Sequence, residues 1–187
     1  MRRDCMNLGK LTDTLQTEID QKRQEIRSDR YSMSIGEWIS LYQQEEIEIY
    51  SGFLKLHHWS DHQKTYLIES ILLGIPIPPI FVSQRKDGIW DVIDGLQRLS
   101  TIYQFVGILK DEDGKQLPSL ILQKTEHLPS LGDKLWKDEE HPEGSIKGFT
   151  PTQRLLIKRF KIDVNILLEQ NEPSAKYELF QRLNPRS

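Results

Sequence analysis

Cysteine is almost missing from this chain of 187 residues, which contains a single one, Cys5. One cysteine excludes an internal disulfide framework and a zinc site built from several thiolates. The position of Cys5 close to the terminus also argues against a catalytic thiol. Because scarce cysteine fits a reducing compartment, we expect a cytoplasmic location.

Long apolar runs are missing as well. No stretch reaches the ~18 consecutive apolar residues that a membrane-spanning helix needs. The opening residues "MRRDCMNLGK" lack the apolar segment of a signal peptide. We therefore expect that the membrane is not a partner.

The chain has no excess of positive charge, with 25 basic against 28 acidic residues and a formal net charge of −3. No global basic field draws such a chain onto nucleic acid. Contact with DNA would depend on a local basic surface or on a partner. With 37% hydrophobic residues the chain is able to bury a core for one domain.

One stretch, "VIDGLQRLSTIYQF" at residues 92–105, combines the features of a strand, a turn and a helix. Asp94 and Gly95 follow the strand-like "WDVI", and apolar residues then recur at helical spacing up to Gly107. The first turn of a helix presents unpaired N–H groups that stabilise an anion. Arg98 in that turn is able to form a bidentate contact with phosphate. Gly95 would let a ligand approach the backbone.

The remaining polar positions of this helix, Gln97, Thr101 and Gln104, are expected on the same face as Arg98. A purely structural interpretation is also open. Asp94 with Gln97 three residues later matches a capping box, and caps are far commoner than phosphate sites. Gly95 would then serve only the turn. If Arg98 were locked in an internal ion pair, with the surrounding cleft filled by side chains, the enzymatic interpretation would be wrong and only the scaffold interpretation would remain.

The rest of the chain predicts a mixture of helices and short strands. Capping boxes at Ser34–Glu37 and Ser60–Gln63 open two helices, and Thr150–Pro151 opens a third. An Asp-Gly pair at 87–88 predicts a hairpin. Alternation or β-rich composition predicts strands at residues 46–50, 80–83, 90–93 and 161–168. Residues 1–32, rich in charge and helix formers, predict a surface helical arm.

Other candidate sites are weaker. The basic residues of the third helix, Arg154, Lys158, Arg159 and Lys161, could contact a phosphate backbone, but a solvated face is the commoner meaning. His58 and His62 have the spacing of a metal pair. Ser60 between them is expected to begin the helix, so they would not share one helical face. The four tryptophans are expected in packing rather than base stacking.

Four segments together resemble a bacterial family: "SMSIGEWISLYQQEEIEI", "WSDHQKTYLIESILLGIPIPPIFV", "WDVIDGLQRLSTIYQFVG" and "KYELFQRLN". They are similar to the N-terminal module of GmrSD modification-dependent restriction enzymes, with their DGQQR-type motif. The resemblance implies an α+β fold of the ParB and sulfiredoxin-like superfamily, a small mixed sheet flanked by helices. It would occupy residues 33–187, following the arm at 1–32.

The resemblance implies nucleoside triphosphate binding and hydrolysis that gate DNA cleavage by a separately encoded nuclease in phage defence. Carried over by motif, the implied catalytic residues are Asp94, Gln97 and Arg98. The implied phosphate-binding residues are Gly95, Arg98, Thr101, Lys55, Arg182 and Asn184. Mg²⁺ is the implied companion of the triphosphate, with Asp94 as its ligand.

Two departures from the family pattern stand out. Lys55 stands where the family has arginine, so a bidentate fork is lost there. The chain also ends at "NPRS", where family members continue, so we expect it to lack their C-terminal helical portion. Both departures keep a second hypothesis open, a catalytically silent DNA-binding or protein-interaction module. A metal-dependent DNA-nicking nuclease is the third, disfavoured because the motif holds one acid where metal nucleases cluster several.

Overall fold

The computed structural model describes residues 14–20, 27–49, 59–138 and 147–168. Residues 14–20 are helical and mostly exposed, as expected for part of a surface arm. None of the helices in these described ranges is long and apolar enough to cross a membrane. The helices and strands of residues 27–168 form an α+β fold, which confirms the predicted class.

A mixed sheet of five strands forms the centre of the fold. The strands are ordered β1-β5-β3-β4-β2, and their bounds are β1 Arg27–Ser34, β2 Ile47–Glu48, β3 Ile80–Gln84, β4 Trp90–Asp94 and β5 Lys161–Leu168. β1 pairs with β5 and β3 with β4 in antiparallel fashion. The pairs β3–β5 and β2–β4 are parallel. The hairpin between β3 and β4 turns at Gly88, whose φ of 88° suits the predicted Asp-Gly turn.

Among the described residues of the range 35–159, four α-helices accompany the sheet: α2 Ile35–Gln43, α4 Asp61–Leu72, α5 Leu96–Val106 and α6 Pro151–Arg159. A short 3₁₀ helix, η1, spans Pro129–Leu131. Ser34, Ser60 and Thr150 each accept a hydrogen bond from the third residue of the helix that follows, whose side chain bonds back to the cap. All three predicted helix starts are therefore confirmed, because a side-chain oxygen satisfies an N–H that the helix leaves unpaired.

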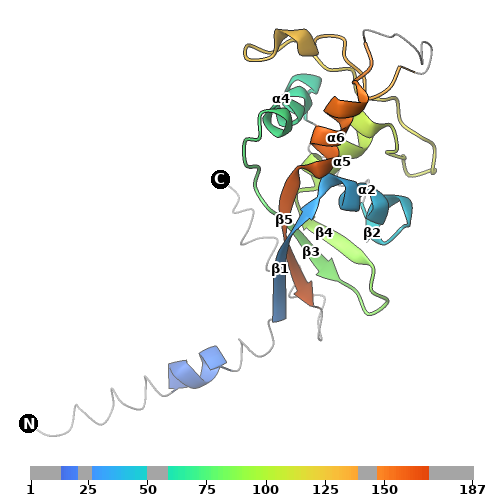
Figure 1. Ribbon diagram of the computed structural model, residues 1–187. Coiled ribbons are helices and arrows are strands. Elements are labelled where there is room, and N and C mark those ends of the chain that lie inside the picture. Colours follow the sequence, from blue (N-terminus) through green and yellow to red (C-terminus); the bar gives the residue numbers. More distant parts are fainter. Residues whose placement is uncertain (1–13, 21–26, 50–58, 139–146, 169–187) are drawn as a thin grey trace, which may run out of the picture.

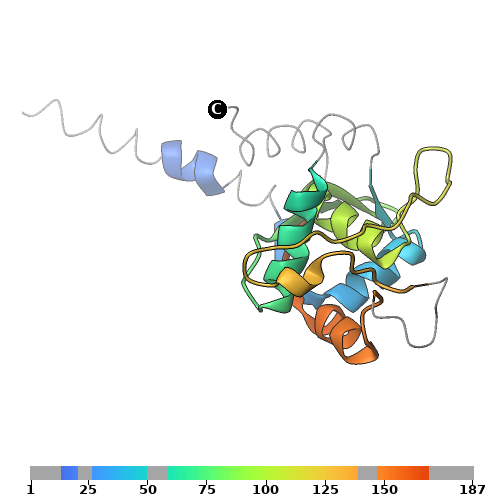
Figure 2. The ribbon, with the colours of Figure 1, turned by 90° about the horizontal axis from the view of Figure 1, so that it is seen from above.

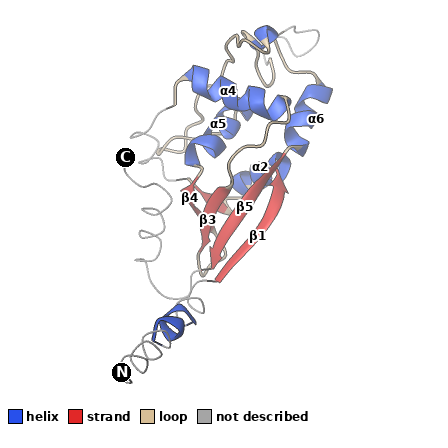
Figure 3. Cartoon of the chain, turned by 90° about the vertical axis from the view of Figure 1, so that its left-hand side faces the viewer, coloured by secondary structure: helices blue, strands red, loops and turns tan. Residues whose placement is uncertain are grey.

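Topology brings these helices to one end of the sheet. β1 and β4 end where β3 and β5 begin, since Ser34 pairs with Lys161 and Asp94 with Phe81. The chain passes there from β1 into α2 and from β4 into α5, and it enters β3 and β5 there after α4 and α6. Figures 1 and 3 show the helices grouped at that end. The start of α5 consequently lies where sheet and helices meet.

The core lies between the sheet and the helices. Its largest fully buried side chains include Trp38, Tyr103, Phe105, Ile35 and Ile68. Seen from above, α5 runs between α4 and α2 (Figure 2). The ring of Tyr103 stacks on Tyr42 at 4.3 Å, and its hydroxyl donates to the Trp38 carbonyl at 3.0 Å. Trp38 and Trp136 are buried, as expected for packing residues.

The long connection from α5 to α6 is fixed by a buried carboxylate that the sequence analysis did not single out. Glu69 of α4 accepts hydrogen bonds from the hydroxyl of Thr125 and from the backbone N–H of Leu128, the latter at 3.1 Å. Glu69 and Thr125 are only 4% and 6% exposed. A loop without regular structure is thereby tied to a helix, since buried polar groups require partners.

The boundary of the expected arm needs correction. We expected helical residues up to position 32, but β1 begins at Arg27 and pairs with β5 along its whole length. The sequence "RSDRYSMS" gives little sign of a strand, because this strand lies at an edge and has only Tyr31 and Met33 as apolar residues. Tertiary pairing overrides local propensity here. The sheet therefore starts before Met33.

Candidate functional site

The turn between β4 and α5 is built on Gly95. Gly95 is the N-cap of α5, with a left-handed φ of 98°, and no side chain caps the helix. The first backbone bond of the helix runs from the N–H of Leu99 to the Gly95 carbonyl at 3.0 Å. The proposed capping box of Asp94 and Gln97 is therefore wrong. Asp94 is the last residue of β4, one position too early to cap the helix.

Two features require glycine at position 95. A left-handed φ is strained for residues with a side chain. In addition, a Cβ there would lie 2.3 Å from Cδ1 of Ile80 and 3.2 Å from a terminal nitrogen of Arg98. Ile80 at the start of β3 thus presses on the turn from one side. The predicted hairpin of residues 80–83 and 90–93 already brings Ile80 near the motif, but how close the contact is depends on the register of the two strands, which shifts between Phe81 and Val82.

The guanidinium of Arg98 is held beside this turn by Asp94. One Arg98 terminal nitrogen donates to Oδ2 of Asp94 at 2.7 Å. The side chain of Arg98 is 11% exposed and that of Asp94 is 32% exposed. The arginine is therefore nearly buried, whereas its partner carboxylate reaches solvent. The internal ion pair that the scaffold interpretation requires is therefore present, but its Asp94 member is accessible to solvent.

The other polar residues of α5 do not form one open face. Thr101 is 1% exposed, and its hydroxyl donates to the Gln97 carbonyl at 2.7 Å. Gln104 accepts from Nζ of Lys64 at 3.0 Å and donates to the Pro118 carbonyl at 3.2 Å. Thr101 thus serves the helix backbone, and Gln104 joins α5 to α4. Gln97, half-buried in the first turn, remains near Arg98.

Three residues assigned from the family resemblance, Lys55, Arg182 and Asn184, lie outside the described residues.

The described residues do not form a metal site by themselves. Within residues 14–20, 27–49, 59–138 and 147–168, no group of three or more His, Cys, Asp or Glu residues could hold a metal ion. His62 packs edge-on against Tyr66 at 4.4 Å, and His58 lies outside these ranges. Mg²⁺ commonly binds through one or two carboxylates together with substrate phosphates. Asp94 is the one carboxylate of the motif, and it accepts a hydrogen bond from Arg98.

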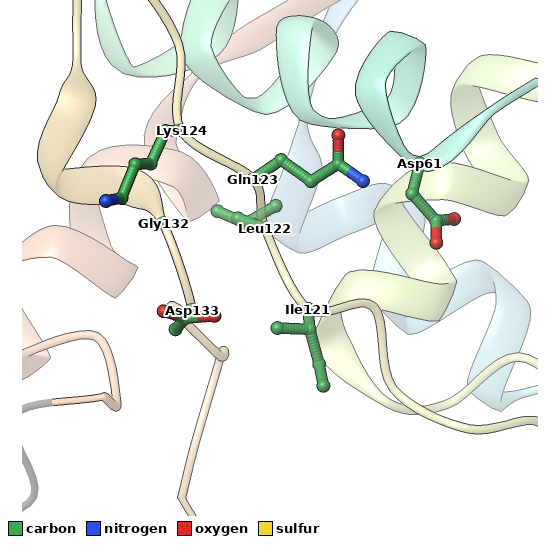
Figure 4. A pocket seen from close by; sticks show the side chains of 7 residues that line it. All are labelled: Asp61, Ile121, Leu122, Gln123, Lys124, Gly132 and Asp133. Atoms are coloured by element: carbon green, nitrogen blue, oxygen red, sulfur yellow. The ribbon is translucent and has the colours of Figure 1, made fainter.

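A shallow hollow of about 400 Å³ lies elsewhere on the molecule. It is lined by Asp61 at the start of α4 and by residues of the connection before and after η1: Ile121, Leu122, Gln123, Lys124, Gly132 and Asp133 (Figure 4). None of the residues from Asp94 to Arg98 lines it. The hollow is open to solvent and is separate from the motif, which is the candidate site.

Comparison with known proteins shows the family of the chain. The family model of the GmrSD restriction endonuclease N-terminal domain matches residues 55–187, a range that contains the strand-turn-helix motif and most of the core. No curated protein and no solved structure matches. The chain therefore belongs to the family of GmrSD restriction endonuclease N-terminal domains.

Proposed function

We propose that this member of a restriction system is a regulatory module that binds, and hydrolyses, a nucleoside triphosphate. The observation that carries the proposal is the start of α5. No side chain caps this helix, and its first turn is placed beside a guanidinium. Such a helix start stabilises an anion through backbone N–H groups and the helix dipole. Arginine adds a fork that matches phosphate oxygens.

Each residue of the motif has a role in the proposal. The N–H groups of the first turn and Arg98 would bind phosphate oxygens. Gln97 would orient a water for attack on the terminal phosphorus. The bond between that phosphorus and the bridging oxygen then breaks, giving a nucleoside diphosphate, inorganic phosphate and a proton. Asp94 would bind Mg²⁺, which neutralises charge on the phosphates.

The resemblance to the family adds three residues to the proposed site: Lys55, Arg182 and Asn184. A lysine at position 55 supplies charge without a fork, so we expect weaker orientation of the phosphate chain than an arginine would give. Lys55→Arg should tighten triphosphate binding, whereas Lys55→Ala should weaken it. In a restriction system, the hydrolysis would control DNA cleavage by a separate nuclease.

Calorimetric titration tests the proposal. The wild-type chain should bind ATP or GTP in the presence of Mg²⁺, and Arg98→Ala should lose at least about 90% of the affinity, since hydrogen bonds to charged groups are worth about 1.5–3 kcal/mol. Arg30→Ala is the matched control, because Arg30 is an exposed arginine on β1. Equal heats for Arg98→Ala and Arg30→Ala, or no heat for any variant, would overturn the proposal.

The second candidate is a silent DNA-binding module, favoured by the basic end of α6. Lys158 and Arg159 occupy its last turn, and both are exposed together with Lys161. Their positive charge is local in a chain of net charge −3. Gel shifts over a salt series, for wild type and for the double variant Lys158→Ala with Arg159→Ala, test it. Salt-sensitive binding that this variant loses, with no effect of nucleotide, would favour this candidate.

A further inference from the structure

The ion pair between Asp94 and Arg98 bears on how the proposed site would open. The carboxylate lies 2.7 Å from the guanidinium, on the strand side of the turn. A phosphate that used the fork of Arg98 would require the same donor nitrogen. Carboxylate and phosphate oxygens compete for guanidinium N–H groups through the same geometry. The two anions would also repel each other if both remained beside Arg98.

The burial of the two partners indicates which of them moves. Arg98 is 11% exposed and lies against Gly95, within 3.2 Å and 3.4 Å of the position that a Cβ would take. Asp94 is 32% exposed. A short side chain with access to solvent is able to rotate away, whereas a packed arginine has little room. Arg98 therefore stays, and the carboxylate leaves.

We propose that Asp94 is an internal competitor that occupies Arg98 until a phosphate displaces it. This inference rests on the proposed function and adds a regulatory role for that same site. The free protein is held in a closed state in which Arg98 is paired. Binding a phosphate exchanges one anion for another at the guanidinium and releases the Asp94 carboxylate, which is then free for the Mg²⁺-binding role proposed above.

The closed state lowers the affinity of the site for phosphate below the value that the site would have without the ion pair. When a protein must first leave a competing state, its apparent dissociation constant increases by the inverse of the competent fraction. A partly exposed ion pair is worth up to about 1 kcal/mol, which corresponds to about fivefold. Removal of the carboxylate charge should therefore tighten phosphate binding by about that factor.

Asp94→Asn tests the inference in a chelating buffer, so that divalent cations contribute nothing. The probes are inorganic tripolyphosphate and ATP, titrated by calorimetry into the whole chain. Asp94→Asn should bind both about fivefold more tightly than wild type, while its own melting temperature falls because the ion pair is lost. Asp113→Asn is the control, since Asp113 is an exposed acid in the 113–114 turn and asparagine suits that turn equally well.

The outcomes separate the two proposals. Wild-type binding that Asp94→Asn leaves equal or weaker would overturn the competition, even if Arg98→Ala abolishes binding. A gain shared equally by Asp113→Asn would also overturn it, because the effect would then be one of net charge. If Arg98→Ala binds as well as wild type, the proposed site itself is wrong.

Discussion

Gly95 and Ile80 are packed so closely that a methyl group at Gly95 would lie 2.3 Å from the Ile80 Cδ1 atom. Both strands of the β3–β4 hairpin thus shape the motif. Ile80 begins β3, and Gly95 follows β4 directly. The turn is constrained both by this contact and by the left-handed φ of 98°.

Gly95→Ala should destabilise the fold by about 1–3 kcal/mol, since it combines backbone strain with a steric clash. Ile80→Val removes the Cδ1 atom and alone should cost about 0.5–1.5 kcal/mol. In the Ile80→Val background the cost of Gly95→Ala should be smaller. Urea unfolding of the four proteins in this cycle measures the difference. Strictly additive costs would mean that Ile80 does not constrain the turn.

Glu69 should be required for the order of the connection between α5 and α6. Glu69→Ala leaves the Thr125 hydroxyl without its acceptor and leaves the Leu128 N–H with only the Thr125 hydroxyl oxygen, at 3.1 Å. A buried group that loses its partner costs about 1–3 kcal/mol. Glu69→Gln keeps an acceptor oxygen and should cost less. Hydrogen exchange at Leu128 reports the loop directly. Unchanged protection of Leu128 in Glu69→Ala would contradict this role.

The start of α2 should be sensitive to pH through Glu37. Hydrogen bonds from the Ser34 side chain and backbone lower the pKa of the Glu37 carboxyl below 4.5. Because the folded pKa is the lower one, the stabilisation is complete above about pH 4.5 and is lost as the pH falls through the folded value.

Glu37→Gln isolates this effect, since glutamine occupies the same capping position at Gln63 and Gln153 of this chain. The difference in melting temperature between wild type and Glu37→Gln should therefore shrink between pH 6 and pH 3. Ser34→Ala should cost about 1 kcal/mol near neutral pH. A difference that stays constant over this range would show that ionised Glu37 contributes nothing.

Local signals predicted most of the elements. The caps at Ser34, Ser60 and Thr150 mark helix starts because side chain and backbone satisfy each other within a few residues. The same kind of local argument failed at Asp94, where Gly95 takes the cap position. Sequence spacing cannot distinguish Asp94 from Gly95 as the cap, because the two residues are adjacent and either could precede the helix.

Long-range pairing explains what the sequence did not reveal. β1 is a strand because β5 lies beside it. The partners of Arg98 and Thr101 are local, each four residues earlier in the chain, but the burial of the two side chains depends on packing. The motif itself was found from its order of strand, turn and helix. Its polar residues were expected on one open face, yet Arg98 and Thr101 are both buried. The local spacing of residues does not predict which polar side chains the fold will bury.

The most direct measurement of the central claim is the amide NMR spectrum of the chain during titration with a triphosphate. If phosphate binds at the start of α5, the N–H signals of residues 95–98 should shift saturably, with the Arg98 guanidinium signal moving at the same midpoint. Saturable shifts confined to other parts of the chain, with residues 95–98 unmoved, would contradict the account.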